Sequence, residues 1–356
     1  YIKNNFSNNP FFNEIASKYK TNMNKLIHNP DANLKKYVSF DLDSTLIKTK
    51  SERKFPLDEN DWTWLYDCIP EILKKLHFEG FHIIIITNQS EKKVPVITTK
   101  INNICNLLDI TITALICYEE PYRKPCMRSI LENFNPKLIK FYCGDALGRP
   151  KDFANTDLLF GFNLNIPVTS PEEFFLQEKT LPYSIPPPLT LKHYPIQLKY
   201  VENHVIIISG YPASGKSSFA KYLADNYKYT IISQDIFKTA AKTRKAFLEA
   251  LGKNPIIIDN TSPDIPSRRF YIEKAQEKHL QIDSIYCTTP INVAYHLNYI
   301  RCEQSEQPKF IPKIVYYTFR KKFQQPSTDE GFTELYQYTP NIDKTIFENF
   351  RYPIIQ

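Results

Sequence analysis

The sequence predicts an α/β protein built from two parallel-sheet domains, and three observations support this. Short runs of β-branched residues, each ending in a polar residue, alternate with stretches in which apolar residues recur at helical spacing. A proline cluster at 182–200 interrupts this alternation, and a second series begins after it. The length of 356 residues also fits two domains of about 150 residues each.

The first domain is expected at residues 36–181, after an irregular lead-in at 1–35 that is rich in Asn and Lys. Leu65, Ile69 and Leu76 recur at helical spacing within 62–76, which predicts a helix there. Runs that are apolar on both faces are typical of buried parallel strands. Such strands are predicted at 37–40, 83–86 and 139–143.

The second domain is expected at residues 201–356 and is separated from the first by a stiff linker at 182–200. Five prolines lie in that linker, and proline can complete neither a helix interior nor a sheet ladder. A new alternation of strands and helices follows the linker and predicts a second parallel sheet. Its strands are predicted at 205–208, 230–233, 256–258 and 282–286.

Composition excludes several classes of protein. Apolar residues make up 42% of the chain, which is enough to bury two cores, and no apolar run approaches the ~18 residues of a membrane span. The beginning of the chain lacks the pattern of a secretory signal. The seven cysteines never form a CxxC pair, which favours reduced thiols in an intracellular protein over a zinc cage or a disulfide framework. A net charge of +7 permits a polyanionic partner without requiring one, and we expect a monomer.

A phosphate-binding loop is predicted at the start of the second domain. Residues 210–217 read GYPASGKS, the G-x-x-x-x-G-K-S pattern, between the strand at 205–208 and a helical stretch. Backbone N–H groups of such a loop surround a polyphosphate, while Lys216 reaches the outer phosphates and Ser217 is a Mg²⁺ ligand. The chain has only eight glycines, so two of them in one short loop argue against a chance turn. The pattern therefore predicts nucleoside triphosphate binding.

Further polar residues favour a kinase over a GTPase or a motor ATPase. Asp235 follows a predicted strand, where its carboxylate can accept the proton of an attacking hydroxyl. Asp259 ends another strand and can act on the metal side, like a Walker B carboxylate. Arg268 and Arg301 are candidates to stabilise the transferring phosphate, although an arginine considered alone is more often a solvated surface charge.

The first domain carries paired carboxylates directly after its first strand. Asp41 and Asp43 belong to a D-x-D-S-T sequence, whose spacing places both carboxylates on the same side of an extended tip. Asp41 can then attack phosphorus and Asp43 can act as general acid and base, with Asp145 as a third oxygen ligand for Mg²⁺. Thr87 and Lys124 can bind and neutralise the phosphate. The alternative is a turn with two solvated acids, but all these elements follow in chain order. They predict hydrolysis of a phosphate ester through a phosphoaspartate.

Both halves resemble one family, the eukaryotic polynucleotide kinase 3′-phosphatases. In that family a haloacid-dehalogenase-like phosphatase precedes a P-loop kinase of the adenylate-kinase-like type. The resemblance covers residues 36–340 in the family's order of phosphatase, proline linker and kinase. The family's phosphopeptide-binding FHA module has no counterpart in it. The phosphatase half is similar at 40–47, 87–89, 123–125, 144–149, 151–153 and 169–175, and the kinase half at 210–217, 258–261, 267–271, 296–301 and 317–332.

The resemblance implies a nuclear repair enzyme that acts on DNA strand-break ends. It would remove a 3′-phosphate and transfer the γ-phosphate of ATP to a 5′-OH, with Mg²⁺ as cofactor. Ser44 and Gln234 depart from the family, which usually has Gly and Arg there. The resemblance names no protein partner. Motif matching assigns catalysis to Asp41, Asp43, Thr87, Lys124, Asp235 and Arg301, metal binding to Asp41, Asp43, Asp145 and Ser217, and ATP binding to Gly210, Ser214, Gly215, Lys216, Ser217, Ser218, Asp259 and Arg268.

Three other functions remain as alternatives. The same chemistry on RNA ends is one, although the sequence shows no RNA-binding module such as RRM or KH. A kinase–phosphatase for small molecules is another, because both folds are used by metabolic enzymes. A scaffold without catalytic activity is disfavoured, since it predicts eroded motifs and these are complete.

Overall fold

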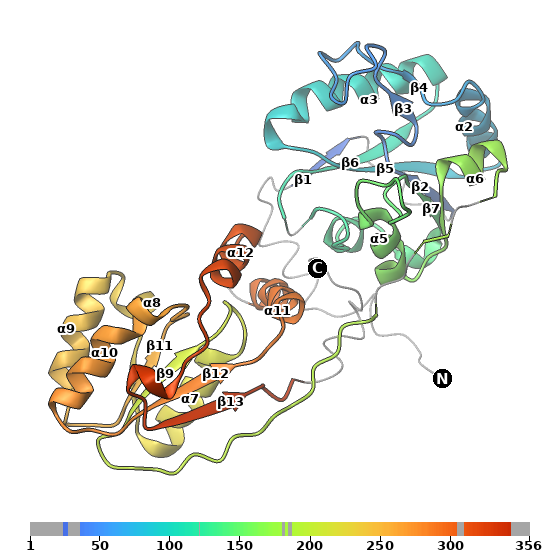
Figure 1. Cartoon of the computed structure of the whole chain (residues 1–356). Helices are drawn as coiled ribbons and strands as arrows, with labels where there is room; N and C mark the ends of the chain where they lie inside the picture. Colours follow the sequence, from blue (N-terminus) through green and yellow to red (C-terminus); the bar gives the residue numbers. More distant parts are fainter. Residues whose placement is uncertain are drawn as a thin grey trace, which may run out of the picture. The chain divides into compact units, whose positions relative to one another are not determined.

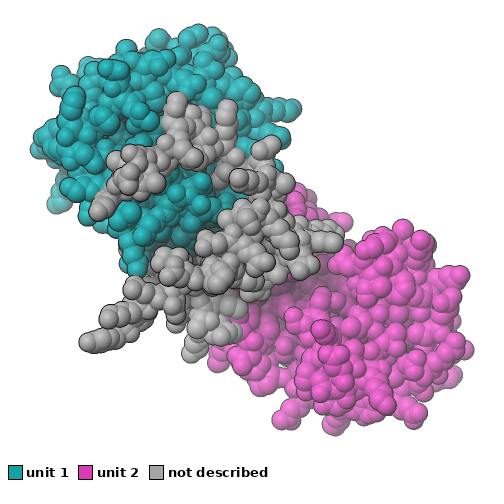
Figure 2. Space-filling view, turned by 180° about the vertical axis from the view of Figure 1, so that it is seen from behind, with its two compact units in different colours: residues 1–187 teal, residues 188–356 magenta. Residues whose placement is uncertain are grey.

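The computed structural model describes residues 24–27, 36–120, 122–179, 182–183, 187–304 and 310–342. The chain divides into two compact units, unit 1 at 1–187 and unit 2 at 188–356 (Figure 1, Figure 2). Each unit is a largely parallel sheet with helices on both faces, so the predicted fold class is confirmed. Within the described residues, no helix combines the length and the apolar character that a membrane span needs.

Unit 1 is built on a six-stranded sheet in the order β1-β6-β5-β2-β7-β8. All neighbouring strands are parallel except the edge pair β1–β6. The strands are β1 Asn24–Ile27, β2 Tyr37–Phe40, β5 His82–Asn88, β6 Ile112–Cys117, β7 Ile139–Cys143 and β8 Val168–Thr169.

Helices cover both faces of this sheet because its central strands are buried on both sides. Helices α2 Ile69–Phe78 and α3 Val94–Leu108 pack on one face with residues such as Phe40 and Ile85, and α5 Thr156–Leu164 lies on the other, where Phe160 packs on Tyr142 (Figure 1). The smaller elements are β3 Ile47–Lys48, β4 Thr63–Trp64, η1 Glu91–Lys93, α4 Arg128–Leu131, η2 Pro136–Leu138 and α6 Pro171–Leu176.

Two sequence predictions for unit 1 need correction. The helix predicted at 62–76 begins only at Ile69, with proline in its first turn, because 63–64 pair with 47–48 in a hairpin instead. The lead-in at 1–35 is not irregular throughout, since Asn24–Ile27 form an edge strand antiparallel to β6. This strand forms because it pairs with the outer edge of β6. Its four residues alone have no pattern that predicts a strand. The rest of the lead-in lies outside the described residues.

Unit 2 is a five-stranded parallel sheet in the order β10-β11-β9-β12-β13. Helix α7 packs on one face through Phe219 and Leu223, while α9 and α10 pack on the other through Phe247 and Ile272. The elements are β9 Val205–Ser209, α7 Lys216–Tyr227, β10 Thr230–Ile232, α8 Gln234–Phe237, α9 Ala240–Ala250, β11 Ile256–Asp259, α10 Ile265–Glu277, β12 Ile282–Cys287, α11 Ile291–Gln304, α12 Lys313–Lys322, η3 Thr328–Glu330 and β13 Glu334–Tyr338.

The proline-rich stretch is only partly a linker. The boundary between the units lies after Pro187, within the predicted linker at 182–200. The part after the boundary belongs to unit 2, because Ile196 and Leu198 pack against the sheet and Tyr194 forms an antiparallel bridge with Thr339. Proline excludes regular structure from this stretch, but it does not prevent apolar residues between the prolines from being buried.

Candidate active sites

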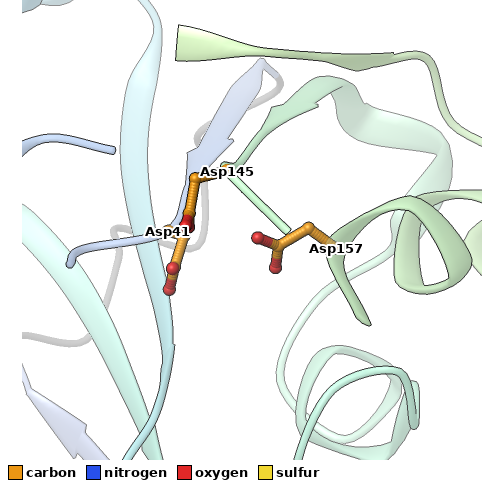
Figure 3. A group of neighbouring side chains, drawn as sticks. All are labelled: Asp41, Asp145 and Asp157. Carbon is orange, nitrogen blue, oxygen red and sulfur yellow. The ribbon is translucent and has the colours of Figure 1, made fainter. Parts of the chain in front are cut away.

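The phosphatase-like residues of unit 1 meet at the carboxyl edge of its sheet. Asp41 directly follows β2, Thr87 lies near the end of β5, and Asp145 follows β7. Because β2 is paired with both β5 and β7 in parallel, these strand ends lie side by side. A third carboxylate, Asp157, comes from the first turn of α5 and points toward the other two (Figure 3). One carboxylate oxygen from each of the three residues lies within 4.8 Å of the other two.

This group differs from the predicted metal set by one member. Among the described residues it contains Asp41, Asp145 and Asp157, whereas the sequence predicts Asp43 beside Asp41 and Asp145. The Asp157 Oδ2 accepts a 3.0 Å hydrogen bond from the Ala146 backbone N–H, so folding of the loop places the carboxylate beside Asp145. The one available sequence signal was an isolated acid in an otherwise apolar helix start at 156–162.

Lys124 is buried between two of these acids. Its Nζ lies 2.8 Å from Asp41 Oδ1 and 2.7 Å from Asp157 Oδ1, and it donates a 2.6 Å hydrogen bond to the Tyr142 hydroxyl. The Asn88 side chain fixes the Lys124 backbone through two hydrogen bonds of 2.8 and 3.0 Å. Burial disfavours the charged ammonium, but the charges of Asp157 and Asp41 outweigh it and raise the pKa of Lys124.

The electrostatics of the group fit a divalent cation. Burial raises the pKa of Asp41 well above its usual value, with Lys124 opposing and the other two aspartates adding to the shift. Burial, reinforced by the charge of Asp157, raises the pKa of Asp145 to about 6. Three carboxylates face one ammonium, so two negative charges are left for a hard cation with oxygen ligands. The residues present therefore fit a divalent metal held by Asp41, Asp145 and Asp157.

Asp43 is exposed and does not belong to the three-carboxylate group. The Gln89 amide donates hydrogen bonds to Asp43 Oδ2 at 2.7 Å and to Thr87 Oγ1 at 2.9 Å, and thereby couples the two side chains. The sequence alone does not predict this role for Gln89. Ser44 adopts φ 59°, in the left-handed region that favours glycine, and the chain turns there with a side chain present.

The predicted phosphate-binding loop lies between β9 and α7 in unit 2. Lys216 is buried, and its Nζ donates to the Gly210 carbonyl at 3.0 Å and to the Tyr211 carbonyl. Burial lowers the pKa of Lys216. Gly215 has φ 98°, and a Cβ there would lie 2.9 Å from Pro340 Cγ, so the loop needs glycine at this position. The Ser214 carbonyl accepts a 2.8 Å hydrogen bond from Thr289.

Other predicted kinase residues surround the beginning of α7. Burial raises the pKa of Asp259, against which a hydrogen bond from Ser217 and the charge of Lys216 act. Asp259 and Ser217 are therefore close enough to interact, as expected for the metal side of a nucleotide site. The charges of Asp235 and Arg301 also affect the pKa of Lys216, so both lie near the loop. Ser218 is exposed on the first turn of α7.

Arg268, predicted to bind ATP, has other partners. It is fully buried, and its Nε and one terminal nitrogen form 2.8 and 2.7 Å hydrogen bonds to the two carboxylate oxygens of Glu330. Its other terminal nitrogen donates to the Ser262 carbonyl at 3.0 Å. All three guanidinium nitrogens are thus occupied within the protein, which does not support a direct contact with ATP. Motif position alone could not reveal a partner 62 residues further along the chain.

Comparison with known proteins matches both units. The polynucleotide kinase 3 phosphatase family profile matches residues 36–175, and an AAA domain profile matches residues 205–326. A bifunctional polynucleotide phosphatase/kinase of Schizosaccharomyces pombe is 36% identical over 322 residues, covering 85% of this chain and 79% of the relative.

Two further relatives differ in how much of the chain they match. A putative bifunctional polynucleotide phosphatase/kinase of Acanthamoeba polyphaga mimivirus is 30% identical over 376 residues, covering 87% of this chain and 86% of the relative. A polynucleotide 3′-phosphatase of Arabidopsis thaliana is 27% identical over 175 residues, covering 41% of this chain and 25% of the relative. The family resemblance is therefore confirmed: the chain belongs to the bifunctional polynucleotide phosphatase/kinase family, with its phosphatase in unit 1 and its kinase in unit 2.

Proposed function

We propose that this protein prepares broken DNA for ligation. Unit 1 would hydrolyse 3′-phosphates through a phosphoaspartate on Asp41, and unit 2 would transfer the γ-phosphate of ATP to 5′-hydroxyl ends. The observation that carries the proposal is the buried Asp41–Lys124 pair within a three-carboxylate group, on a chain that also has a complete phosphate-binding loop. We place this activity in the nucleus, and localisation of the tagged chain tests that assignment.

The phosphatase reaction uses two carboxylates with different surroundings. Asp41 attacks the phosphorus of the 3′-phosphate, and the bond between phosphorus and the 3′-oxygen breaks. Asp43, which is exposed and held by Gln89, donates the proton to that leaving oxygen and then accepts one from the water that hydrolyses the aspartyl phosphate. Lys124 balances the charge beside Asp41. Mg²⁺ held by Asp41, Asp145 and Asp157 would supply further neutralisation of the phosphate oxygens.

The kinase reaction divides its work in a comparable way. Asp235 accepts the proton of the 5′-hydroxyl as its oxygen attacks the γ-phosphorus of ATP. Lys216, near the charge of Arg301, neutralises the outer phosphates. Ser217 and Asp259, whose side chains interact at the start of α7, would hold Mg²⁺.

Exposed aromatic rings on unit 1 support a nucleic acid substrate. Phe153 is 92% exposed and Phe55 is 63% exposed, and the Lys54 ammonium lies 5.3 and 5.8 Å from the centres of these two rings. The Lys93 ammonium lies 4.8 Å from the Phe55 ring. We call these four residues the aromatic–lysine platform. Lys54 and Phe55 lie between β3 and β4, Lys93 is the last residue of η1, and Phe153 lies on the loop between β7 and α5. Rings that stack on bases, with cations for phosphates beside them, suit a strand end better than a small metabolite.

The test uses a nicked duplex that carries both a 3′-phosphate and a 5′-hydroxyl, with Mg²⁺ and γ-labelled ATP. Release of phosphate and transfer of label are followed in parallel for the wild type, Asp41→Asn and Lys216→Ala. We expect Asp41→Asn to lose only phosphate release and Lys216→Ala to lose only labelling. The same ends on an RNA duplex provide the second arm. Faster reaction on RNA, or loss of both activities in one correctly folded variant, would refute the proposal.

A further inference from the structure

A buried ion pair behind the kinase site joins three segments of unit 2. Arg268 of α10 is fully buried and binds both carboxylate oxygens of Glu330 in η3, whose side chain is 4% exposed. Glu330 also accepts a 3.1 Å hydrogen bond from the Ser327 backbone N–H. The remaining arm of Arg268 reaches the Ser262 carbonyl at 3.0 Å. The pair thereby connects η3 and α10 to the loop that follows β11.

That loop, residues 260–262, touches the kinase residues on either side of it. The Thr261 carbonyl accepts a 3.2 Å hydrogen bond from the Gly210 backbone N–H, at the start of the phosphate-binding loop. The Asn260 side chain accepts a 2.9 Å hydrogen bond from the Gln234 backbone N–H, which directly precedes Asp235. Asp259 immediately precedes the loop. A displacement of 260–262 would therefore move the phosphate-binding loop, the proposed base Asp235 and the metal-side carboxylate Asp259 together.

The backbone of the loop needs support from outside. Ser262 has φ 42°, a left-handed conformation that is strained for a residue with a side chain. Its carbonyl oxygen accepts hydrogen bonds from Arg268 and, at 3.2 Å, from the Ser209 hydroxyl at the end of β9. These contacts hold the strained turn in place, and Arg268 is the only one of the two donors that is itself fixed by an ion pair.

We infer that Arg268 is a positioning residue for the kinase reaction and that Glu330 orients it. Arg268 contributes through the Ser262 carbonyl, by holding the 260–262 loop so that Gly210, Asp235 and Asp259 keep their relative places. This inference rests on the kinase activity of unit 2. It differs from the role predicted from the sequence, in which Arg268 itself touches ATP.

A purely structural role makes a different prediction, and a double substitution separates the two. Removing one partner of a buried ion pair strands the other charge, whereas replacing both by apolar residues is often neutral for stability. In Arg268→Met alone, both the melting temperature and the kinase kcat should fall. In Arg268→Met with Glu330→Leu, the melting temperature should recover. The kinase kcat should stay reduced on the order of tenfold, because the bond to Ser262 is still missing.

The experiment measures kinase kcat and the KM for ATP in the full chain, well below the melting temperature determined by calorimetry. The phosphatase activity of unit 1 is the internal control and should not change. Recovery of kcat together with stability in the double variant would overturn the inference. A wild-type chain that fails to label 5′-hydroxyl ends would instead contradict the proposed function, so the two failures are distinguishable.

A second pair of variants decides the question if the double variant does not fold. Glu330→Gln keeps an acceptor for Arg268 and leaves its bond to Ser262, whereas Arg268→Gln removes that bond. We expect the loss of kcat to be on the order of tenfold for Arg268→Gln and at most about threefold for Glu330→Gln. Equal losses of kcat that follow the losses of stability would show that the pair acts on folding alone.

Discussion

The carboxylate of Asp157 occupies the space that a side chain on Gly144 would need. A Cβ built on Gly144 would lie 2.5 Å from Asp157 Oδ2, closer than real Cβ atoms approach. Gly144 also connects β7 to Asp145, so the absence of a side chain at this position lets two acids from different elements approach each other. The glycine is thus part of what assembles the three-carboxylate group.

Replacement of Gly144 by alanine should therefore disable the phosphatase without affecting the kinase. The new methyl group would displace Asp157 from Lys124 and from the Ala146 backbone N–H, which removes one carboxylate from the group. We expect release of 3′-phosphate to fall by on the order of 100-fold, as for loss of a group that orients a metal site. Gly80→Ala is the control for general destabilisation, because φ 83° strains an added side chain there while its Cβ meets no atom within 4 Å. An active Gly144→Ala variant would contradict the assigned role of Asp157.

The same group predicts how the phosphatase responds to metal. Chelation by EDTA should abolish phosphate release, and Mg²⁺ should restore it, because three carboxylates face one ammonium. Asp157→Asn removes one negative charge from the group. The variant should therefore reach half-maximal activity only at a Mg²⁺ concentration about tenfold or more above that of the wild type. Asp67→Asn serves as control, since that aspartate is exposed and does not belong to the carboxylate group. An unchanged Mg²⁺ requirement in Asp157→Asn would exclude it as a ligand.

The fold could be predicted from sequence largely because its central strands are buried on both faces. The strands at 37–40, 83–86 and 205–208 are continuous apolar runs, and the structure confirms them. Strand β6 is equally buried but is not among the predicted strands, and β1 depends on pairing with β6 rather than on its own residues. Local periodicity thus accounts for central strands better than for edges.

The same holds for the site residues: those in contiguous motifs can be predicted from sequence, and those placed by contacts distant in the chain cannot. Asp41, Thr87 and Lys216 belong to contiguous motifs at strand ends, and the topology of each sheet places them with their neighbours. Asp157 joins its site only after a loop folds back, and Arg268 is defined by a distant glutamate. No pattern within a short window contains either relationship.

Stability of unit 1 should decrease as the pH falls below about 6.5, in part because of His82. Burial, with a smaller effect of the charge of His77, lowers the pKa of His82 from the usual 6.5 to about 4, and its Nε2 lies 2.6 Å from Thr113 Oγ1. The unfolded chain therefore binds a proton at a higher pH than the folded chain does. The contribution is fully present above pH 6.5 and is lost as the pH falls toward 4.

Urea unfolding followed by tryptophan fluorescence measures this effect in unit 1. The only two tryptophans of the chain, Trp62 and Trp64, both pack against the core of that unit. His82→Gln, which offers an amide to Thr113 but no titrating group, should show a shallower fall in the unfolding free energy between pH 6.5 and 5. Identical pH profiles for the two proteins would show that His82 is not responsible.

The aromatic–lysine platform predicts a selective defect with long substrates. Phe153 is almost fully exposed, so Phe153→Ala should not alter folding, and it leaves the carboxylate group and Lys124 intact. A base that stacks on the ring loses on the order of 1–3 kcal/mol when the ring is removed, which raises the KM for a 3′-phosphorylated oligonucleotide by roughly 5- to 150-fold. Hydrolysis of p-nitrophenyl phosphate, which has no neighbouring base, should keep its wild-type kcat and KM. Phe78→Ala is the matched control, because Phe78 is 83% exposed at the end of α2 and does not belong to the platform. If Phe153→Ala weakened both substrates equally, or neither, the ring would have no part in recognising the strand.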